Sequence, residues 1–145
     1  YHVGDARDLE SLKLGEFDAA TCVLALMNIN PLVPALKSVS NCLKAGGTFV
    51  SIILHPAFRN PGNTSWGWAA ATPKRTTQTR TPVSRQEVQY RRVDAYLSQT
   101  HKDIVMNPGA VSSGAKEVTT TTYHRPISAY VADFARSGFG ITALE

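Results

Sequence analysis

Residues 17–54, FDAATCVLALMNINPLVPALKSVSNCLKAGGTFVSIIL, contain two continuous apolar runs with a helical pattern between them. The runs 17–26 and 48–54 do not alternate apolar and polar residues, which predicts strands in a sheet covered on both faces. A helix is predicted over 31–43 from the spacing of Leu32, Leu36, Val39 and Leu43. A strand, a helix and a strand in succession predict a right-handed crossover between parallel neighbours, and so an α/β fold with a doubly wound sheet.

The chain that follows His55 differs in composition. Residues 56–92 are rich in Pro, Gly, Thr, Ser and Arg and include Trp66 and Trp68, without a sustained hydrophobic period. This pattern predicts a long irregular insertion. Insertions of this length in a compact domain are usually functional lids or disordered.

The C-terminal part has a clearer pattern. Residues 102–106 and 116–123 are β-prone and predict a hairpin flap joined across Asn107-Pro108-Gly109. Residues 128–137 predict a short amphipathic helix, and 141–144 predict the start of another strand. The C-terminal part is therefore expected to form a hairpin, a helix and the start of a strand, in that order.

Composition limits the class of protein. The chain has 145 residues, of which 43% are hydrophobic and 18% charged, as expected of one soluble globular domain. No apolar run approaches the ~18 residues needed to cross a bilayer, and no leader pattern opens the chain. We expect a cytoplasmic protein without a membrane partner. Cys22 and Cys42 have no metal-ligand spacing and are expected to be small buried hydrophobes, so no metal site is predicted.

Positive charge is concentrated in one segment. The net charge is only +4. Basic residues nevertheless crowd residues 74–92, opposed there only by Glu87; they are Lys74, Arg75, Arg80, Arg85, Arg91 and Arg92. A solvated basic loop is the favoured interpretation, and contact with an anionic partner is the alternative.

Three strand ends and one turn carry motifs in a specific order. They are 1–6 (YHVGDA), 24–28 (LALMN), 54–56 (LHP) and the turn 43–47 (LKAGG). This order resembles the second half of a class I S-adenosylmethionine-dependent methyltransferase. In that family a GDA turn follows the third strand, the fourth strand begins with FD, and an L-K-x-G-G turn introduces the fifth. Residues 128–141 (SAYVADFARSGFGI) resemble the family's last helix and the strand that follows it.

The resemblance implies a Rossmann-like sheet without its first two strands and without the glycine-rich cofactor loop, since neither precedes Tyr1. Residues 1–55 would form the core with half of the cofactor site, 56–126 a lid and flap insertion, and 127–145 the last helix and the start of the following strand. An incomplete sheet leaves an open hydrophobic edge. We therefore expect the chain to be unstable and inactive alone, and to require the missing N-terminal part of its own domain.

The cofactor implied is S-adenosylmethionine. By the resemblance its binding residues are Asp5, Ala6, Val23, Leu24 and Met27. The Asp5 carboxylate would accept a hydrogen bond from the adenine amine, and the Ala6 N–H would serve a ring nitrogen. A turn or helix-capping role is the alternative for Asp5. Buried packing is the alternative for the three apolar residues.

His55 ends a predicted central strand at the ligand edge, so it is the candidate catalytic base or acceptor-orienting group. A histidine bonded to a neighbouring loop is the alternative.

The candidate substrate residues are Asn28, Phe58, Trp66, Tyr90, His124 and Arg125. Arg125 suits a carboxylate or phosphate, although His124 and Arg125 are as well explained by fixing the flap to the next helix. Trp66, Trp68 and Tyr90 would wall the pocket or form a satellite cluster.

Three functions remain open. Methyl transfer to a small-molecule acceptor is favoured. A nucleic-acid methyltransferase is less favoured, because the chain has neither an N-P-P-[YF] motif nor a basic and aromatic stripe. A non-catalytic or partner-completed binding module is the third alternative, supported only by the missing glycine loop.

Overall fold

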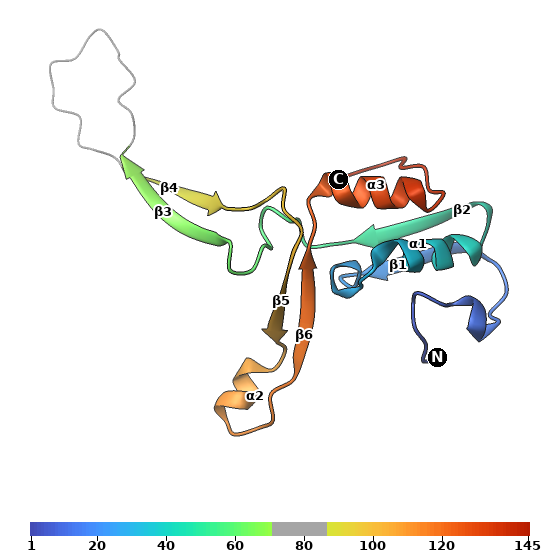
Figure 1. Ribbon diagram of the computed structural model, residues 1–145, viewed down its shortest axis with the longest axis horizontal. Coiled ribbons are helices and arrows are strands. Elements are labelled where there is room, and N and C mark those ends of the chain that lie inside the picture. Colours follow the sequence, from blue (N-terminus) through green and yellow to red (C-terminus); the bar gives the residue numbers. More distant parts are fainter. Residues whose placement is uncertain (71–86) are drawn as a thin grey trace, which may run out of the picture.

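The computed structural model describes residues 1–70 and 87–145, and Figure 1 shows the arrangement of their elements. In chain order these are η1 (Glu10–Leu12), β1 (Phe17–Val23), η2 (Leu26–Asn28), α1 (Leu32–Asn41), β2 (Leu43–Ile52), β3 (Thr64–Ala70), β4 (Glu87–Val93), β5 (Thr100–Val105), α2 (Pro108–Ser112), β6 (Thr119–His124) and α3 (Ile127–Arg136). The fold is mixed α/β.

The predicted strand, helix and parallel strand are confirmed. β1 and β2 pair in parallel, in continuous register from Ala19 opposite Thr48 to Val23 opposite Ile52. The first strand ends earlier than predicted, because Leu24 adopts a left-handed backbone with φ 53° and the chain then enters η2. The second strand begins earlier, at Leu43, with a register shift near its start.

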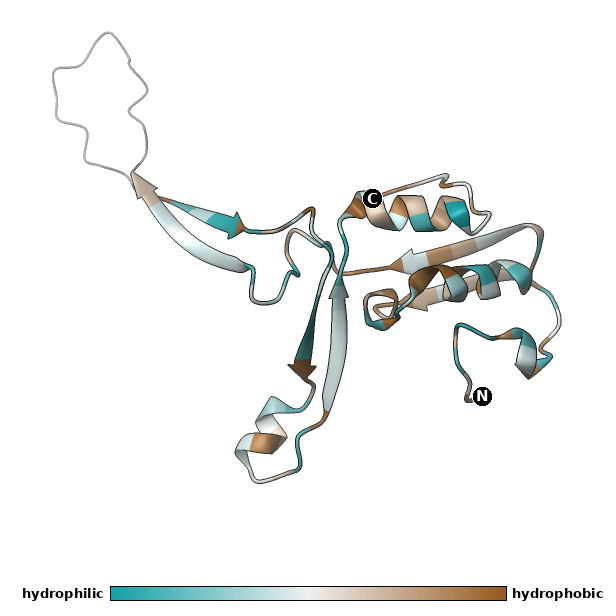
Figure 2. Cartoon of the chain, viewed as in Figure 1, coloured by the Kyte–Doolittle hydropathy of each residue, from teal (hydrophilic) through white to brown (hydrophobic). Residues whose placement is uncertain are grey.

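A small core lies on one face of the β1–β2 sheet. Its buried members come from η2, α1 and α3, and they are Leu26, Leu32, Leu36 and Tyr130. Partly buried residues of the two strands and of α3 pack against them, including Cys22, Phe49, Ile53 and Phe134. Figure 2 shows hydrophobic residues in α1 and β2, whereas β4 and β5 are largely hydrophilic. The predicted amphipathic helix over 128–137 is confirmed by α3, with Tyr130 on its buried face.

The opposite face of this sheet is bare. Val23, Val50 and Ile52 are 60%, 51% and 51% exposed. Because side chains alternate between the faces of a strand, these residues point away from the core that Cys22, Phe49 and Ile53 contact. The prediction of strands covered on both faces is therefore wrong for the described chain: α1 and α3 contribute to one core, and no described element supplies a second.

The strands do not form one sheet. β1–β2, β3–β4 and β5–β6 are three separate two-stranded sheets, and Figure 1 shows the last two extending away from the first. The predicted doubly wound sheet is thus not assembled within the described residues. Its other predicted member, a strand over 141–144, is also absent from them, and these residues form neither strand nor helix. A strand needs a neighbour to satisfy its backbone groups, and none lies beside this segment.

The expectation of an irregular insertion is wrong at two places. β3 and β4 form an antiparallel hairpin, with Trp66 opposite Arg91 and Gly67 opposite Tyr90. Aromatic and β-branched residues at strand positions explain the pairing. The basic residues Lys74, Arg75, Arg80 and Arg85 lie outside the described residues.

The second hairpin is confirmed, with a different connection. β5 and β6 pair antiparallel from Thr100 opposite His124 to Val105 opposite Thr119. In place of a tight turn at 107–109, the connection contains α2, which begins with Pro108, a residue suited to the first helical position. In residues 1–70 and 87–145, no helix is long and apolar enough to span a bilayer.

Candidate functional site

The carboxyl ends of β1 and β2 lie side by side. The Leu24 N–H donates to the Ile52 carbonyl at 2.8 Å, one residue beyond β1. The left-handed backbone of Leu24 costs an L-residue about 1–2 kcal/mol and turns the chain sharply into η2. Val23 and Leu24, both predicted to lie by the cofactor, are more than two-fifths exposed at this edge. A ligand can therefore reach them.

The two predicted residues of η2 differ in exposure. Met27 is only 8% exposed, which agrees with the alternative of apolar packing. Asn28 is exposed. Cofactor contact by Met27 and substrate contact by Asn28 stay predictions.

Asp5 and Arg7 form a tight ion pair. Asp5 Oδ2 lies 2.6 Å from Arg7 Nη2, and Asp5 Oδ1 accepts from the Arg7 backbone N–H at 2.9 Å. These hydrogen bonds lower the pKa of Asp5 from 3.8 to about 2. Asp5 is thus ionised at neutral pH and half exposed, in a turn where its carbonyl also accepts from the Asp8 N–H at 3.0 Å. The structure thus shows Asp5 in a turn, which was the alternative to adenine binding.

Two guanidinium groups hold the segment between η2 and α1. Arg7 Nη1 donates to the Asn30 carbonyl at 3.2 Å. Arg125 Nη2 donates to the Ile29 carbonyl and to Asn30 Oδ1, both at 2.9 Å. Residues from the N-terminal turn, from the chain after β1 and from the end of β6 therefore meet at Asn30.

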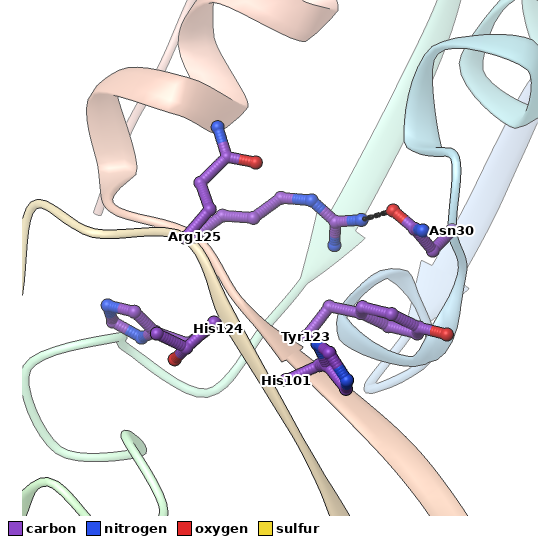
Figure 3. A pocket seen from close by; sticks show the side chains of 7 residues that line it. Asn30, His101, Tyr123, His124 and Arg125 are labelled. Atoms are coloured by element: carbon purple, nitrogen blue, oxygen red, sulfur yellow. Dashed lines mark hydrogen bonds between the residues drawn. The ribbon is translucent and has the colours of Figure 1, made fainter.

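A cavity of about 180 Å³ lies at this meeting point (Figure 3). Its lining residues are Asn30, Gln99, Thr100, His101, Tyr123, His124 and Arg125. The Arg125 guanidinium lies over the Tyr123 ring, 5.4 Å from its centroid, and reaches Asn30. Both predicted residues of the flap, His124 and Arg125, thus line one cavity.

His124 and Arg125 are buried and incompletely bonded. They are 5% and 4% exposed. His124 Nε2 lies 2.9 Å from the Tyr96 carbonyl, while His124 Nδ1 and Arg125 Nη1 have no hydrogen-bond partner among the described residues. Their hydrogen bonds hold the end of the flap against Tyr96, Ile29 and Asn30, so a structural role is present. Each side chain still has one polar atom without a partner among the described residues.

His55 follows β2 and is exposed. Its Nδ1 accepts from the Ala57 N–H at 3.1 Å, and its ring lies 5.5 Å from the Phe58 ring. This is the loop-bonded arrangement considered as the alternative to catalysis. In this arrangement the neutral ring carries its proton on Nε2, so that nitrogen is a donor.

Trp66 and Tyr90, which were predicted to wall the pocket, do not lie on one surface. Because consecutive residues point to opposite faces, Trp66 and the Gly67–Tyr90 pair occupy opposite faces of the β3–β4 hairpin. Arg91 covers Trp66 at 5.2 Å, and its Nη2 donates to the Phe58 carbonyl at 2.9 Å. The structure brings neither Trp66 nor Tyr90 to the cavity at Asn30.

Several residues of this region were not predicted from the sequence. Arg7, Asn30 and His101 had no motif to mark them, because their roles arise from contacts between distant segments. Asn60 is 1% exposed and donates to the Asp94 carbonyl at 3.0 Å, joining the loop after β2 to the end of β4. A polar residue that precedes a proline in an irregular segment offers no signal of such burial.

The cysteines take no part in this region. Both are free thiols, partly buried. Burial raises the pKa of Cys22 above its usual 9.0, which keeps the thiol protonated at neutral pH. Within the described ranges, no group of three His, Cys, Asp or Glu side chains is placed to hold a metal ion.

Comparisons with known proteins agree with the resemblance seen in the sequence. Residues 1–51 match the family described as "Methyltransferase domain". No curated protein matches the chain. Among solved structures, an S-adenosylmethionine-dependent methyltransferase from Mesorhizobium loti matches all of the chain with a TM-score of 0.62 and 23% identity. The chain spans 55% of that protein. Residues 1–51 are thus similar to part of a methyltransferase domain, and the chain shares the fold of the corresponding part of that solved structure.

Proposed function

We propose that this chain contributes to S-adenosylmethionine-dependent methyl transfer to a small-molecule acceptor, within a larger domain. The observation that carries the proposal is the family match over residues 1–51, because that range contains the Asp5 turn and Leu24, one residue beyond β1. The fold similarity of the whole chain supports it. These segments form one side of a cofactor site.

The residues of the Asp5 turn fit the adenine end of this cofactor. The Asp5 carboxylate is charged and half exposed, so it can accept from an exocyclic amine. No acceptor for the Ala6 N–H is found among the described residues, which leaves this donor for a ring nitrogen. An acceptor and a donor on adjacent residues match the edge of adenine. When bound, S-adenosylmethionine supplies an electrophilic methyl group on a sulfonium.

The strand ends then have a positioning role. Leu24 turns the backbone away from the sheet and leaves Val23 and Leu24 exposed beside the end of β2. His55 extends the same edge with Nε2 as a donor. To act as a base it would first have to release the Ala57 N–H. We therefore assign His55 as a group that orients the acceptor, since methyl transfer depends mainly on alignment.

The cofactor assignment is tested by titrating S-adenosylhomocysteine into the full-length protein that contains this chain. Asp5→Ala should weaken binding about 10-fold or more, the effect of losing a charge-assisted hydrogen bond. Glu16→Gln is the control, because Glu16 is exposed and distant from the turn in sequence. If the wild type does not bind, the function is wrong. If Asp5→Ala binds like the wild type, only the adenine clamp is wrong.

The role of His55 is tested in steady-state assays once an acceptor is found. If His55 orients the acceptor, His55→Gln keeps a hydrogen-bond donor. Its kcat should then fall by less than the ~10²–10⁴-fold expected when a general base is lost. The pH profile of kcat should keep its shape. His2→Gln, at an exposed position outside the site, is the matched control. Loss of the acidic limb in His55→Gln would show instead that His55 is the base.

A further inference from the structure

Arg125 carries a buried charge without a counter-ion. Its side chain belongs to a residue only 4% exposed, and the groups around it are all uncharged: the Ile29 carbonyl, the Asn30 amide, the Tyr123 ring and the Tyr130 hydroxyl. Among the ion pairs of residues 1–70 and 87–145, none includes Arg125. Buried charges are normally paired, because removing a charge from water without compensation is costly.

The guanidinium also has an unused donor. Arg125 Nη1 is enclosed by protein and has no hydrogen-bond partner among the described residues. The guanidinium fork presents its donors in a plane that matches an oxyanion. One nitrogen is thus committed to the Asn30 segment, and the other is left without an acceptor among the described residues.

The adjoining cavity has the composition that an anion requires. Its lining includes Arg125 and the hydrogen-bonding side chains of Gln99, Thr100 and His101, and it contains no acidic residue. His101 is exposed and stands opposite Tyr123 in the β5–β6 pairing, with ring centroids 6.1 Å apart. We propose that this cavity is the subsite for a carboxylate or phosphate group of the methyl acceptor, with Arg125 and His101 as its principal donors.

His124 has a different place in this subsite. With Nε2 donating to the Tyr96 carbonyl, the neutral ring has a lone pair at Nδ1. That atom repels an oxyanion unless it gains a proton. His124 therefore holds the end of β6 in position and is not one of the anion's donors.

The location connects this subsite to the cofactor half-site, and the inference rests on the proposed function. Asn30 lines the cavity, and its carbonyl accepts from Arg7, which also holds Asp5. A ligand anchored by its anionic group at Arg125 is therefore kept close to the turn assigned to the adenine. Anchoring of this kind aligns an acceptor without a further catalytic group.

The experiment is an NMR titration of the isotope-labelled full-length protein, with S-adenosylhomocysteine present, at constant ionic strength. Sodium phosphate and sodium acetate are titrated separately. We expect saturable binding of at least one anion; tighter phosphate binding indicates a phosphorylated acceptor, and tighter acetate binding a carboxylate. His101→Gln and Arg125→Lys should each weaken binding about 10-fold or more. Lys102→Gln, which removes a charge beside His101 without altering the lining, should change it less than about twofold.

The other outcomes show whether the anion subsite or the proposed methyltransferase function has failed. Absence of saturable anion binding in a wild type that binds S-adenosylhomocysteine would overturn the subsite and leave the proposed function intact. Anion binding without S-adenosylhomocysteine binding would overturn the proposed function and leave an anion site that is not an acceptor subsite. An equal loss in Lys102→Gln and His101→Gln would also overturn the subsite, because it would indicate diffuse attraction. If Arg125→Lys does not fold, the exposed His101 and Lys102 variants decide the matter.

Discussion

Truncation of Leu36 should destabilise the protein, because its side chain is fully buried in the described core. Leu36 is 0% exposed and belongs to a cluster of four buried residues from η2, α1 and α3. Leu36→Ala removes three carbon atoms, worth about 2.4 kcal/mol at ~0.8 kcal/mol per buried methylene. The cavity left behind adds to this, within the ~2.7–5 kcal/mol measured for buried leucines in lysozyme. We expect a loss of about 3 kcal/mol, toward the lower end, because the core is bounded by one sheet face and can partly relax.

The measurement is urea unfolding of the full-length protein, followed by circular dichroism. With a slope of ~1–3 kcal/mol per molar urea, the midpoint should fall by about 1–3 M at an unchanged slope. Leu97→Ala is the matched control, since Leu97 is 79% exposed, and its effect should stay within ~0.5 kcal/mol. Equal midpoints for the two variants would refute the placement of the core between α1, α3 and the β1–β2 sheet.

Two further perturbations address single contacts. Arg7→Met should raise the pKa of Asp5 from about 2 toward 3.8, as followed by carboxyl-carbon NMR. The wild-type pair stabilises the fold above pH 3.8 and loses that contribution as the pH falls toward about 2, so the variant should lack this transition; an unchanged Asp5 titration would contradict the ion pair. Gly67→Ala should destabilise by less than about 1 kcal/mol, because its Cβ would lie 2.6 Å from the outer end of the Tyr90 ring, and this ring is 46% exposed and can move aside. Gly140→Ala, with open space around it, is the control, and equal thermal shifts for both would show that Tyr90 does not cover Gly67.

The βαβ unit could be predicted because its signals are local. Continuous apolar runs, helical spacing and the Gly46-Gly47 turn each depend on a few neighbouring residues. The same holds for the β5–β6 hairpin and for α3, whose periods are short and regular. The boundaries were less accurate: the left-handed backbone at Leu24 ends β1 before the apolar run does.

The β3–β4 hairpin was not predicted because its pairing joins segments on either side of a long connection. No local period marks Thr64–Ala70, and two exposed tryptophans flank Gly67 in its middle. Strand pairing across such a distance depends on cross-strand contacts, such as Tyr90 over Gly67. The exposure of the sheet face with Val23, Val50 and Ile52 could likewise not be predicted, because an apolar run does not show which of its faces another element covers.

The mixed α/β class, the parallel βαβ unit and the order of methyltransferase-like motifs could be predicted because each depends on residue type and short spacing, and the match over residues 1–51 agrees with the motif order. The pairing of Asp5 with Arg7, and the burial of Arg125 without a counter-ion beside a cavity, emerge only when the chain is folded. Asn30 and Arg125 are 95 positions apart. Contacts over such separations follow from how the elements pack, and residue type and local spacing do not predict that packing.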